Sequence, residues 1–223
     1  MAVTGVGEYG MSGIVGSTAN GSALCYVRND LPTAFSGSVT VEAIAFKNGA
    51  TMRLSTAAVS LPAGGGAVGF FCAGNSSVLS EGKPSQPCPT FEALYRQAGC
   101  ANGAADCILN VTVASRSGGR VLSQSMLPLG LPSALNLPAA KITASVQPAA
   151  SGSASVGITL SSNATSLWVW LSTIEQGRFS DNAFVLLPGV EKKVEFLSFV
   201  EAGTSATALE ASLRVEHLGM YLP

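Results

Sequence analysis

The sequence holds few residues of the types that do acid–base or nucleophilic chemistry. It has a single histidine, His217, and no Gly-x-Ser-x-Gly motif of the kind that exposes a catalytic serine. His217 alternates with Val215 and Leu213, which indicates a half-buried packing role on a strand. No group of residues has metal-ligand spacing. We therefore expect no metal and no cofactor.

The acidic side chains are scattered over separate predicted elements. Paired carboxylates are the groups that hydrolyse glycosidic bonds, and retaining enzymes hold them about 5–5.5 Å apart. No motif in this chain brings two together, and most of its acids resemble ordinary solvated side chains. These acids are Glu42, Glu92, Glu175, Asp181, Glu195 and Glu216. We predict no catalytic residue in the chain.

The densest run of distinctive residues extends from 168 to 189. Trp168 and Trp170 alternate with three aliphatic residues, and this period of two predicts a strand with both faces covered. A second strand is predicted at 184–187. The loop between them is rich in residues that hydrogen-bond to nearby backbone. The loop residues of interest are Arg178, Phe179, Ser180, Asp181 and Asn182.

Three interpretations of this run stay open. The first is loop scaffolding with an ion pair between Arg178 and Asp181. The second is that the loop meets another domain or forms the rim of its pocket. The third is sugar stacking on Trp168 or Trp170, since a flat ring can pack against the C–H face of a sugar. Burial of both tryptophans in a core or between sandwiches is the competing expectation.

The five cysteines are an odd number, so at least one lacks a partner within the chain. The short Ala/Gly/Asn loop between Cys100 and Cys107 favours a disulfide there. Cys72 with Cys88 is the next pair, which would leave Cys25 as a buried strand thiol. Five reduced thiols in a cytosolic protein are the alternative.

Four Asn-x-Ser/Thr sequons offer possible N-glycosylation and hint at the secretory pathway. They stand at Asn20, Asn75, Asn110 and Asn163. The first residues have neither a basic start nor an apolar stretch, so we expect no signal peptide in this chain.

Composition excludes several classes of function. The net charge is −1 and charged residues make up only 11% of the 223 residues, whereas 47% are hydrophobic. Such a chain can bury a sizeable core, and it has no field to attract nucleic acid or an anionic membrane. No apolar run is long enough for a membrane helix. We expect neither nucleic acid nor membrane as a partner.

The remaining elements predict an all-β protein. Strands are expected at 24–27, 38–46, 52–61, 67–72, 107–113 and 120–126, separated by Gly- and Pro-containing turns that include Asn48-Gly49. A short helix from Phe91, with Thr90 as its N-cap and Gly99 as its stop, interrupts them. Its Phe91 and Tyr95 suit packing better than sugar stacking.

The proline-containing segment 127–138 is the predicted linker between two domains. A second set of strands is expected at 141–147, 156–160, 167–172, 184–187, 193–199 and 213–218. The predicted fold is two immunoglobulin-like β-sandwiches, at 21–135 and 139–223. Residues 1–20 are rich in glycine, and we expect them to form a poorly ordered tail.

A family resemblance rests on these motifs. A tryptophan-bearing strand followed by Gly177-Arg-Phe-Ser-Asp-Asn-Ala-Phe184 and a strand ending at Pro188-Gly189 resembles the last domain of β-mannosidases, exoglycosidases of glycoside hydrolase family two. The segment 209–218 resembles the end of the animal enzymes. Segments 26–32, 94–100 and 107–113 resemble the domain before it.

The resemblance implies non-catalytic domains with packing and interdomain roles. The parent would trim terminal β-linked mannose in a lysosome, vacuole or extracellular space, and the partner would be its catalytic (β/α)₈ barrel. That barrel needs roughly 250 residues of alternating strand and helix, which this chain does not supply. The alternatives are a stand-alone carbohydrate-binding module, with mannose-containing glycans as ligands, and a structural or adhesive Ig-like protein.

Overall fold

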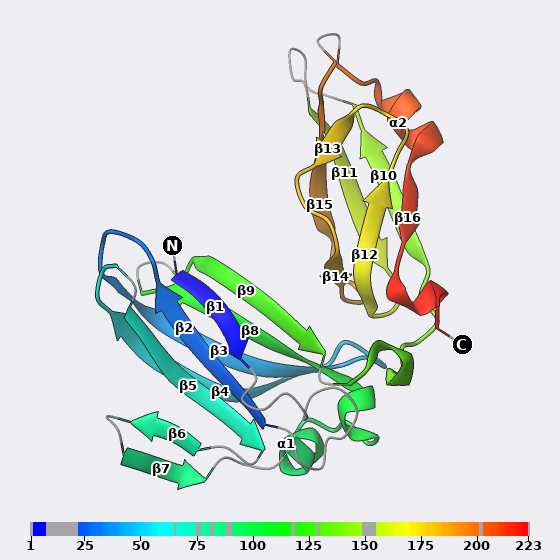
Figure 1. The fold of residues 1–223 in the computed structure, drawn as a ribbon. Coiled ribbons are helices and arrows are strands. Elements are labelled where there is room, and N and C mark those ends of the chain that lie inside the picture. The colour runs from blue at the N-terminus through cyan, green and yellow to red at the C-terminus, as the bar shows by residue number, and fades with distance from the viewer. Residues whose placement is uncertain are drawn as a thin grey trace. The chain divides into compact units, whose positions relative to one another are not determined.

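The computed structural model describes residues 2–7, 22–64, 66–74, 77–80, 83–87, 91–116, 119–128, 130–148, 155–200 and 203–222. The chain divides into two compact units (Figure 1). The first comprises Met1–Ala45 and Ala50–Asn136, and the second comprises Phe46–Gly49 and Leu137–Pro223. No described helix is long and apolar enough to cross a membrane.

The first unit contains two main sheets and a small hairpin. One sheet has the strand order β1-β2-β5, the other has the order β4-β3-β8-β9, and β6 pairs with β7. The bounds are β1 Ala2–Gly7, β2 Ser22–Asn29, β3 Phe35–Ala45, β4 Thr51–Leu61, β5 Gly66–Gly74, β6 Ser77–Ser80, β7 Lys83–Pro87, β8 Cys107–Ser115 and β9 Val121–Pro128.

The core of the first unit follows the predicted alternation. Val39, Val41 and Ala43 of β3 are buried, and they meet alternate residues of β8, including Val111 and Val113. Residues one apart on a strand point to opposite faces, so a period of two places every second side chain in the core. The Asn48-Gly49 turn joins β3 to β4, with Gly49 in the left-handed region at φ 68°.

The predicted tail over residues 1–20 is wrong for residues 2–7. Ala2–Gly7 forms β1, which pairs antiparallel with β2 from Ala2↔Asn29 to Gly7↔Leu24. The backbone hydrogen bonds of a sheet depend little on side chains, so a glycine-rich segment can join an open sheet edge despite its weak propensity. Residues 8–20 lie outside the described residues.

The predicted helix is present as α1, Phe91–Gln97. Leu94 and Tyr95 are buried in the core of the first unit, and burial raises the pKa of Tyr95. Packing, and not sugar binding, therefore accounts for Tyr95. A 3₁₀ turn, η1 Gly103–Ala105, follows, and Ala104 also joins this core.

The predicted linker is more regular than expected. Strand β9 continues to Pro128, and Pro132–Ala134 forms the 3₁₀ turn η2. Proline suits the first position of such a turn, because its φ is already helical and its missing N–H has no partner there anyway.

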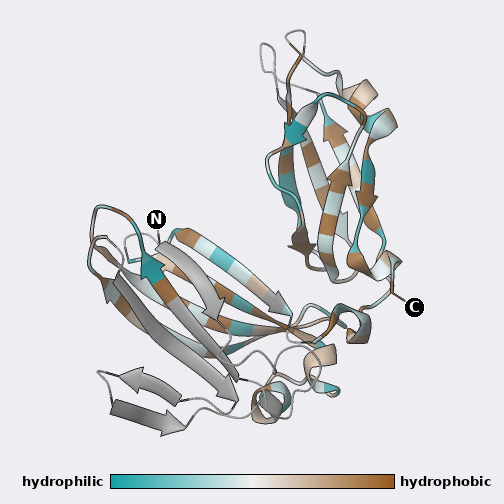
Figure 2. Ribbon diagram, viewed as in Figure 1, coloured by the Kyte–Doolittle hydropathy of each residue, from teal (hydrophilic) through white to brown (hydrophobic). Residues whose placement is uncertain are grey.

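The second unit is a sandwich of two sheets. One has the order β10-β11-β15-β13 and the other the order β14-β12-β16. Figure 2 shows hydrophobic and hydrophilic residues alternating along its strands. The bounds are β10 Ile142–Gln147, β11 Ser155–Ser162, β12 Ser166–Ser172, β13 Gly177–Phe179, β14 Phe184–Leu186, β15 Lys192–Ser198 and β16 Arg214–Glu216.

Both sheets of this unit contribute to one core. Ile158 of β11 and Phe196 of β15 meet Val169 and Leu171 of β12 in a single buried cluster. The all-β prediction is confirmed.

The second unit also contains a helix that was not predicted. Residues Ala206–Ser212 form α2, and the Ser205 hydroxyl caps it by accepting a hydrogen bond from the Ala208 N–H at 3.1 Å. Leu209 of α2 is fully buried in the core. The predicted strand at 213–218 is therefore shorter, consisting of β16 followed by the 3₁₀ turn η3, Leu218–Met220.

Candidate functional site

The two tryptophans lie on the outer face of the sheet β14-β12-β16. Leu167, Val169 and Leu171 of β12 are buried, whereas Trp168 and Trp170 are 38% and 51% exposed. The predicted alternation is correct, but the prediction that both faces are covered is wrong. The inner face of β12 packs on the core, and its outer face presents the two indoles.

A bulge in β12 contains Trp168. Ser166 pairs with Leu186 and Val169 pairs with Phe184, so three steps along β12 oppose two steps along β14. The extra residue bends the strand, and Trp168 has φ 50°, in the left-handed region. A bulky side chain is rare in that region.

Polar residues of β16 flank Trp170. Glu216 lies directly opposite Trp170, and Arg214 lies opposite Ser172. The Tyr221 hydroxyl donates a hydrogen bond to Glu216 Oε1 at 2.7 Å, and this hydrogen bond raises the pKa of Tyr221 because it favours the neutral phenol. We call Trp168, Trp170, Arg214, Glu216 and Tyr221 the tryptophan face.

The loop after β12 is attached to β15 by its first residues. Gly177 has no room for a side chain, because a Cβ there would lie 2.5 Å from the Leu197 carbonyl oxygen and against the Phe196 ring. Phe179 packs edge-on against Phe196, with ring centroids 5.3 Å apart. This part of the motif therefore fixes β13 onto β15.

The polar residues of the loop bond to the backbone of β15 and of β12. The Ser180 hydroxyl accepts a hydrogen bond from the Glu195 N–H at 2.9 Å. The Asn182 side chain accepts from the Leu171 N–H at 2.8 Å and donates to the Leu171 carbonyl at 3.0 Å, as a neighbouring strand would. Scaffolding is therefore a well-supported interpretation for Ser180 and Asn182.

The predicted ion pair between Arg178 and Asp181 is wrong. Asp181 pairs instead with Lys192 of β15, at 2.6 Å, and the Lys192 ammonium also lies 5.2 Å from the centre of the Phe184 ring. Sheet pairing brings β15 to the loop, whereas the Arg178 side chain points to solvent from β13. Arg178 is one of several exposed residues of this segment, together with Ile174, Gln176 and Ser180.

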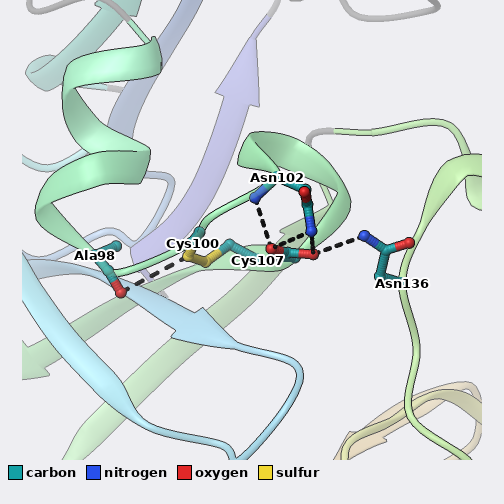
Figure 3. The surroundings of a disulfide bond; sticks show 6 residues. Ala98, Cys100, Asn102, Cys107 and Asn136 are labelled. Atoms are coloured by element: carbon teal, nitrogen blue, oxygen red, sulfur yellow. Dashed lines mark hydrogen bonds between the residues drawn. A yellow bond between two sulfur atoms is a disulfide. The ribbon is translucent and has the colours of Figure 1, made fainter.

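A disulfide joins Cys100 to Cys107 in the first unit (Figure 3). Asp106, beside it, accepts hydrogen bonds from the Asn102 N–H and the Asn136 side chain, each at 2.7 Å. Partial burial opposes ionisation, but these hydrogen bonds outweigh it and lower the pKa of Asp106. The loop is thus closed covalently and by hydrogen bonds.

Only some of the other cysteines and sequons lie within the described residues. Cys25 and Cys72 lie on β2 and β5, while Cys88, Asn20 and Asn75 lie outside the described residues. Asn110 is buried, and its amide bonds to Glu42 and Gln124. Asn163 is exposed at the turn between β11 and β12, an environment that suits a glycan better.

The last candidates for chemistry are His217 and any cluster of metal ligands. His217 is buried at the start of η3, and burial lowers its pKa while a hydrogen bond with the Ala140 backbone opposes this shift. Among the described residues, no group of three His, Cys, Asp or Glu side chains could hold a metal ion.

Comparison with protein-family models identifies the domain family of the second unit. Residues 137–220 match the model of the mannosidase Ig-fold domain. These residues form a mannosidase Ig domain. The resemblance drawn from the sequence and the Ig-like fold are therefore confirmed here. Comparison with the curated proteins finds no match.

Solved structures extend the likeness beyond this mannosidase Ig domain, but as fold alone. A β-D-mannosidase from Dictyoglomus thermophilum aligns with 96% of the chain at TM-score 0.58 and 16% identity. The chain spans 21% of that enzyme. An exo-chitosanase of Amycolatopsis orientalis aligns with 87% of the chain and 24% of its own length, at TM-score 0.47 and 14% identity.

The Gly177–Phe184 segment is thus explained by packing within the second unit. Gly177, Phe179, Ser180 and Asn182 hold three strands together. The feature that sequence reasoning underestimated is the exposure of the two tryptophans, which depends on where the sheet lies in the sandwich.

Proposed function

We propose that this chain forms the non-catalytic C-terminal domains of a β-mannosidase-like exoglycosidase of glycoside hydrolase family two. The parent would hydrolyse terminal β-D-mannose residues of oligosaccharides and glycoproteins. The observation that carries the proposal is the mannosidase Ig domain at residues 137–220. The shared fold over 96% of the chain with a bacterial β-D-mannosidase supports it.

The role of these domains in the proposal is packing against the catalytic (β/α)₈ domain. Arg178 supports this role, because β13 holds it on an exposed edge while its loop neighbours are engaged within the domain. A guanidinium can form paired hydrogen bonds with a carboxylate across a domain interface. The proposal also includes a role for the loop residues 178–182 at the rim of the catalytic domain's pocket.

The compartment in the proposal is a lysosome, a vacuole or the extracellular space. The Cys100–Cys107 disulfide supports it, because such bonds persist in oxidising compartments. The exposed sequon asparagine, Asn163, is consistent with a glycoprotein that passes through the secretory pathway.

The test is immunocapture of the native protein with an antibody against residues 137–220. The captured protein should hydrolyse a chromogenic β-mannoside. The purified 223-residue chain should not, because its sequence offers no carboxylate pair. Hydrolysis by the pure chain would contradict the non-catalytic role, and an inactive capture would favour an adhesive or binding role.

A further inference from the structure

We propose that the tryptophan face is a carbohydrate-binding surface. Trp168 and Trp170 would stack on successive rings of an oligosaccharide, while Glu216, Tyr221 and Arg214 would bind its hydroxyl groups. The site itself follows from the geometry of the sheet β14-β12-β16. The choice of a β-linked mannose chain as its ligand rests on the proposed function.

The first support is the placement of the two indoles. They lie two residues apart on β12, and Trp170 is exposed over half of its surface. Large aromatic side chains contribute most to stability when they are buried, so the exposure of two on one strand is unusual. Flat exposed rings suit the C–H faces of sugars.

The second support is the backbone of Trp168. The bulge in β12 forces this residue to φ 50°, which a glycine would adopt without strain. Strained backbone of this kind gathers at binding and active sites, and bulges there redirect a side chain. A tryptophan at a position suited to glycine indicates that its ring is needed on this face.

The third support is the polar set around the rings. Glu216 stands opposite Trp170, and the 2.7 Å hydrogen bond from Tyr221 to Oε1 fixes its carboxylate. Carboxylate oxygens only accept hydrogen bonds, and the Arg214 guanidinium only donates them. Sugar hydroxyls do both, so an uncharged glycan could satisfy both groups.

The same polar set argues against a protein partner as the natural occupant. A protein that covered the indoles would also bury Glu216 and Arg214, and each would then need its own charged or hydrogen-bonding partner. Phe199 and Val200, which follow β15, are 69% and 43% exposed. Phe199 lies outside the tryptophan face and supplies a matched control.

The experiment is a titration of the full chain with β-1,4-mannohexaose, in which binding is measured by calorimetry and by tryptophan fluorescence. Cellohexaose is the comparison sugar. The variants are Trp170→Ala, Trp170→Phe, Glu216→Gln and the control Phe199→Ala, each checked for folding by circular dichroism.

We expect saturable binding that Trp170→Ala weakens about tenfold, that Glu216→Gln weakens by a smaller factor, and that Phe199→Ala leaves unchanged. Trp170→Phe should retain most of the affinity, because a phenyl ring can still stack.

Three results would overturn the proposal. They are no binding of either sugar by the folded chain, equal losses in Trp170→Ala and Phe199→Ala, and self-association in gel filtration that Trp170→Ala abolishes. Binding of cellohexaose but not mannohexaose would keep the site and contradict the proposed function.

Discussion

Trp168 provides a direct energetic test of the strained bulge in β12. At φ 50° an alanine carries the left-handed penalty of about 1–2 kcal/mol, whereas glycine does not. In an ordinary strand, glycine is instead less stable than alanine by about 0.5–1 kcal/mol. The difference predicts that Trp168→Gly is more stable than Trp168→Ala by about 0.5–1 kcal/mol.

The assay is urea unfolding followed by tryptophan fluorescence. The sequence contains two tryptophans, and both lie in the second unit, so the remaining Trp170 reports on that unit alone. At an m-value of about 1–3 kcal/mol/M, the predicted difference shifts the urea midpoint by roughly 0.2–1 M. The matched control is the same pair of substitutions at Trp170, which is not among the described residues with positive φ.

At position 170 we expect the usual order, with alanine more stable than glycine. If Trp168→Ala is as stable as Trp168→Gly or more stable, the backbone at 168 is not strained as described. Backbone strain at Trp168 would then give no support to a binding role for its ring.

Three further predictions concern the second unit. Asn182→Ala should lower the free energy of unfolding by about 1–3 kcal/mol, because it leaves the Leu171 N–H and carbonyl without their side-chain partner; an unchanged urea midpoint would contradict this. Gly177→Ala should cost about 1–3 kcal/mol through its clash with Phe196 and Leu197, whereas the same change at Gly189, which has open space but φ 75°, tests left-handed strain alone. The folded-state pKa of His217 lies below its unfolded value near 6.5, so its contribution to stability is complete above that pH. This contribution is lost as the pH falls toward the folded-state pKa, by at most about 1.4 kcal/mol per pH unit. The variant His217→Gln should lack this pH dependence of the free energy of unfolding, and equal slopes in the two proteins would refute the assignment.

The features that could be predicted from sequence are those that depend on local alternation and turn residues. The strands around Val39–Ala43 and Leu167–Leu171, and the helix at Phe91–Gln97, follow from period two, capping residues and glycine turns. The short Cys100–Cys107 loop likewise favours the disulfide that the structure contains.

The features that escaped prediction depend on contacts distant in sequence. Lys192 takes the place predicted for Arg178 because β15 pairs with β13. Alternation alone gives the side on which Trp168 and Trp170 lie but not whether another layer covers that side. Helix α2 is two turns long, and tertiary packing of Leu209 stabilises it more than propensity does.

The central claim is that these two units belong to a larger glycosidase. The most direct test is the size of the native polypeptide on a reducing immunoblot with an antibody against residues 137–220. We predict a band several times larger than the 22.5 kDa of this chain. A band near 22.5 kDa, allowing for glycans, would contradict the claim and leave binding through the tryptophan face as the leading function.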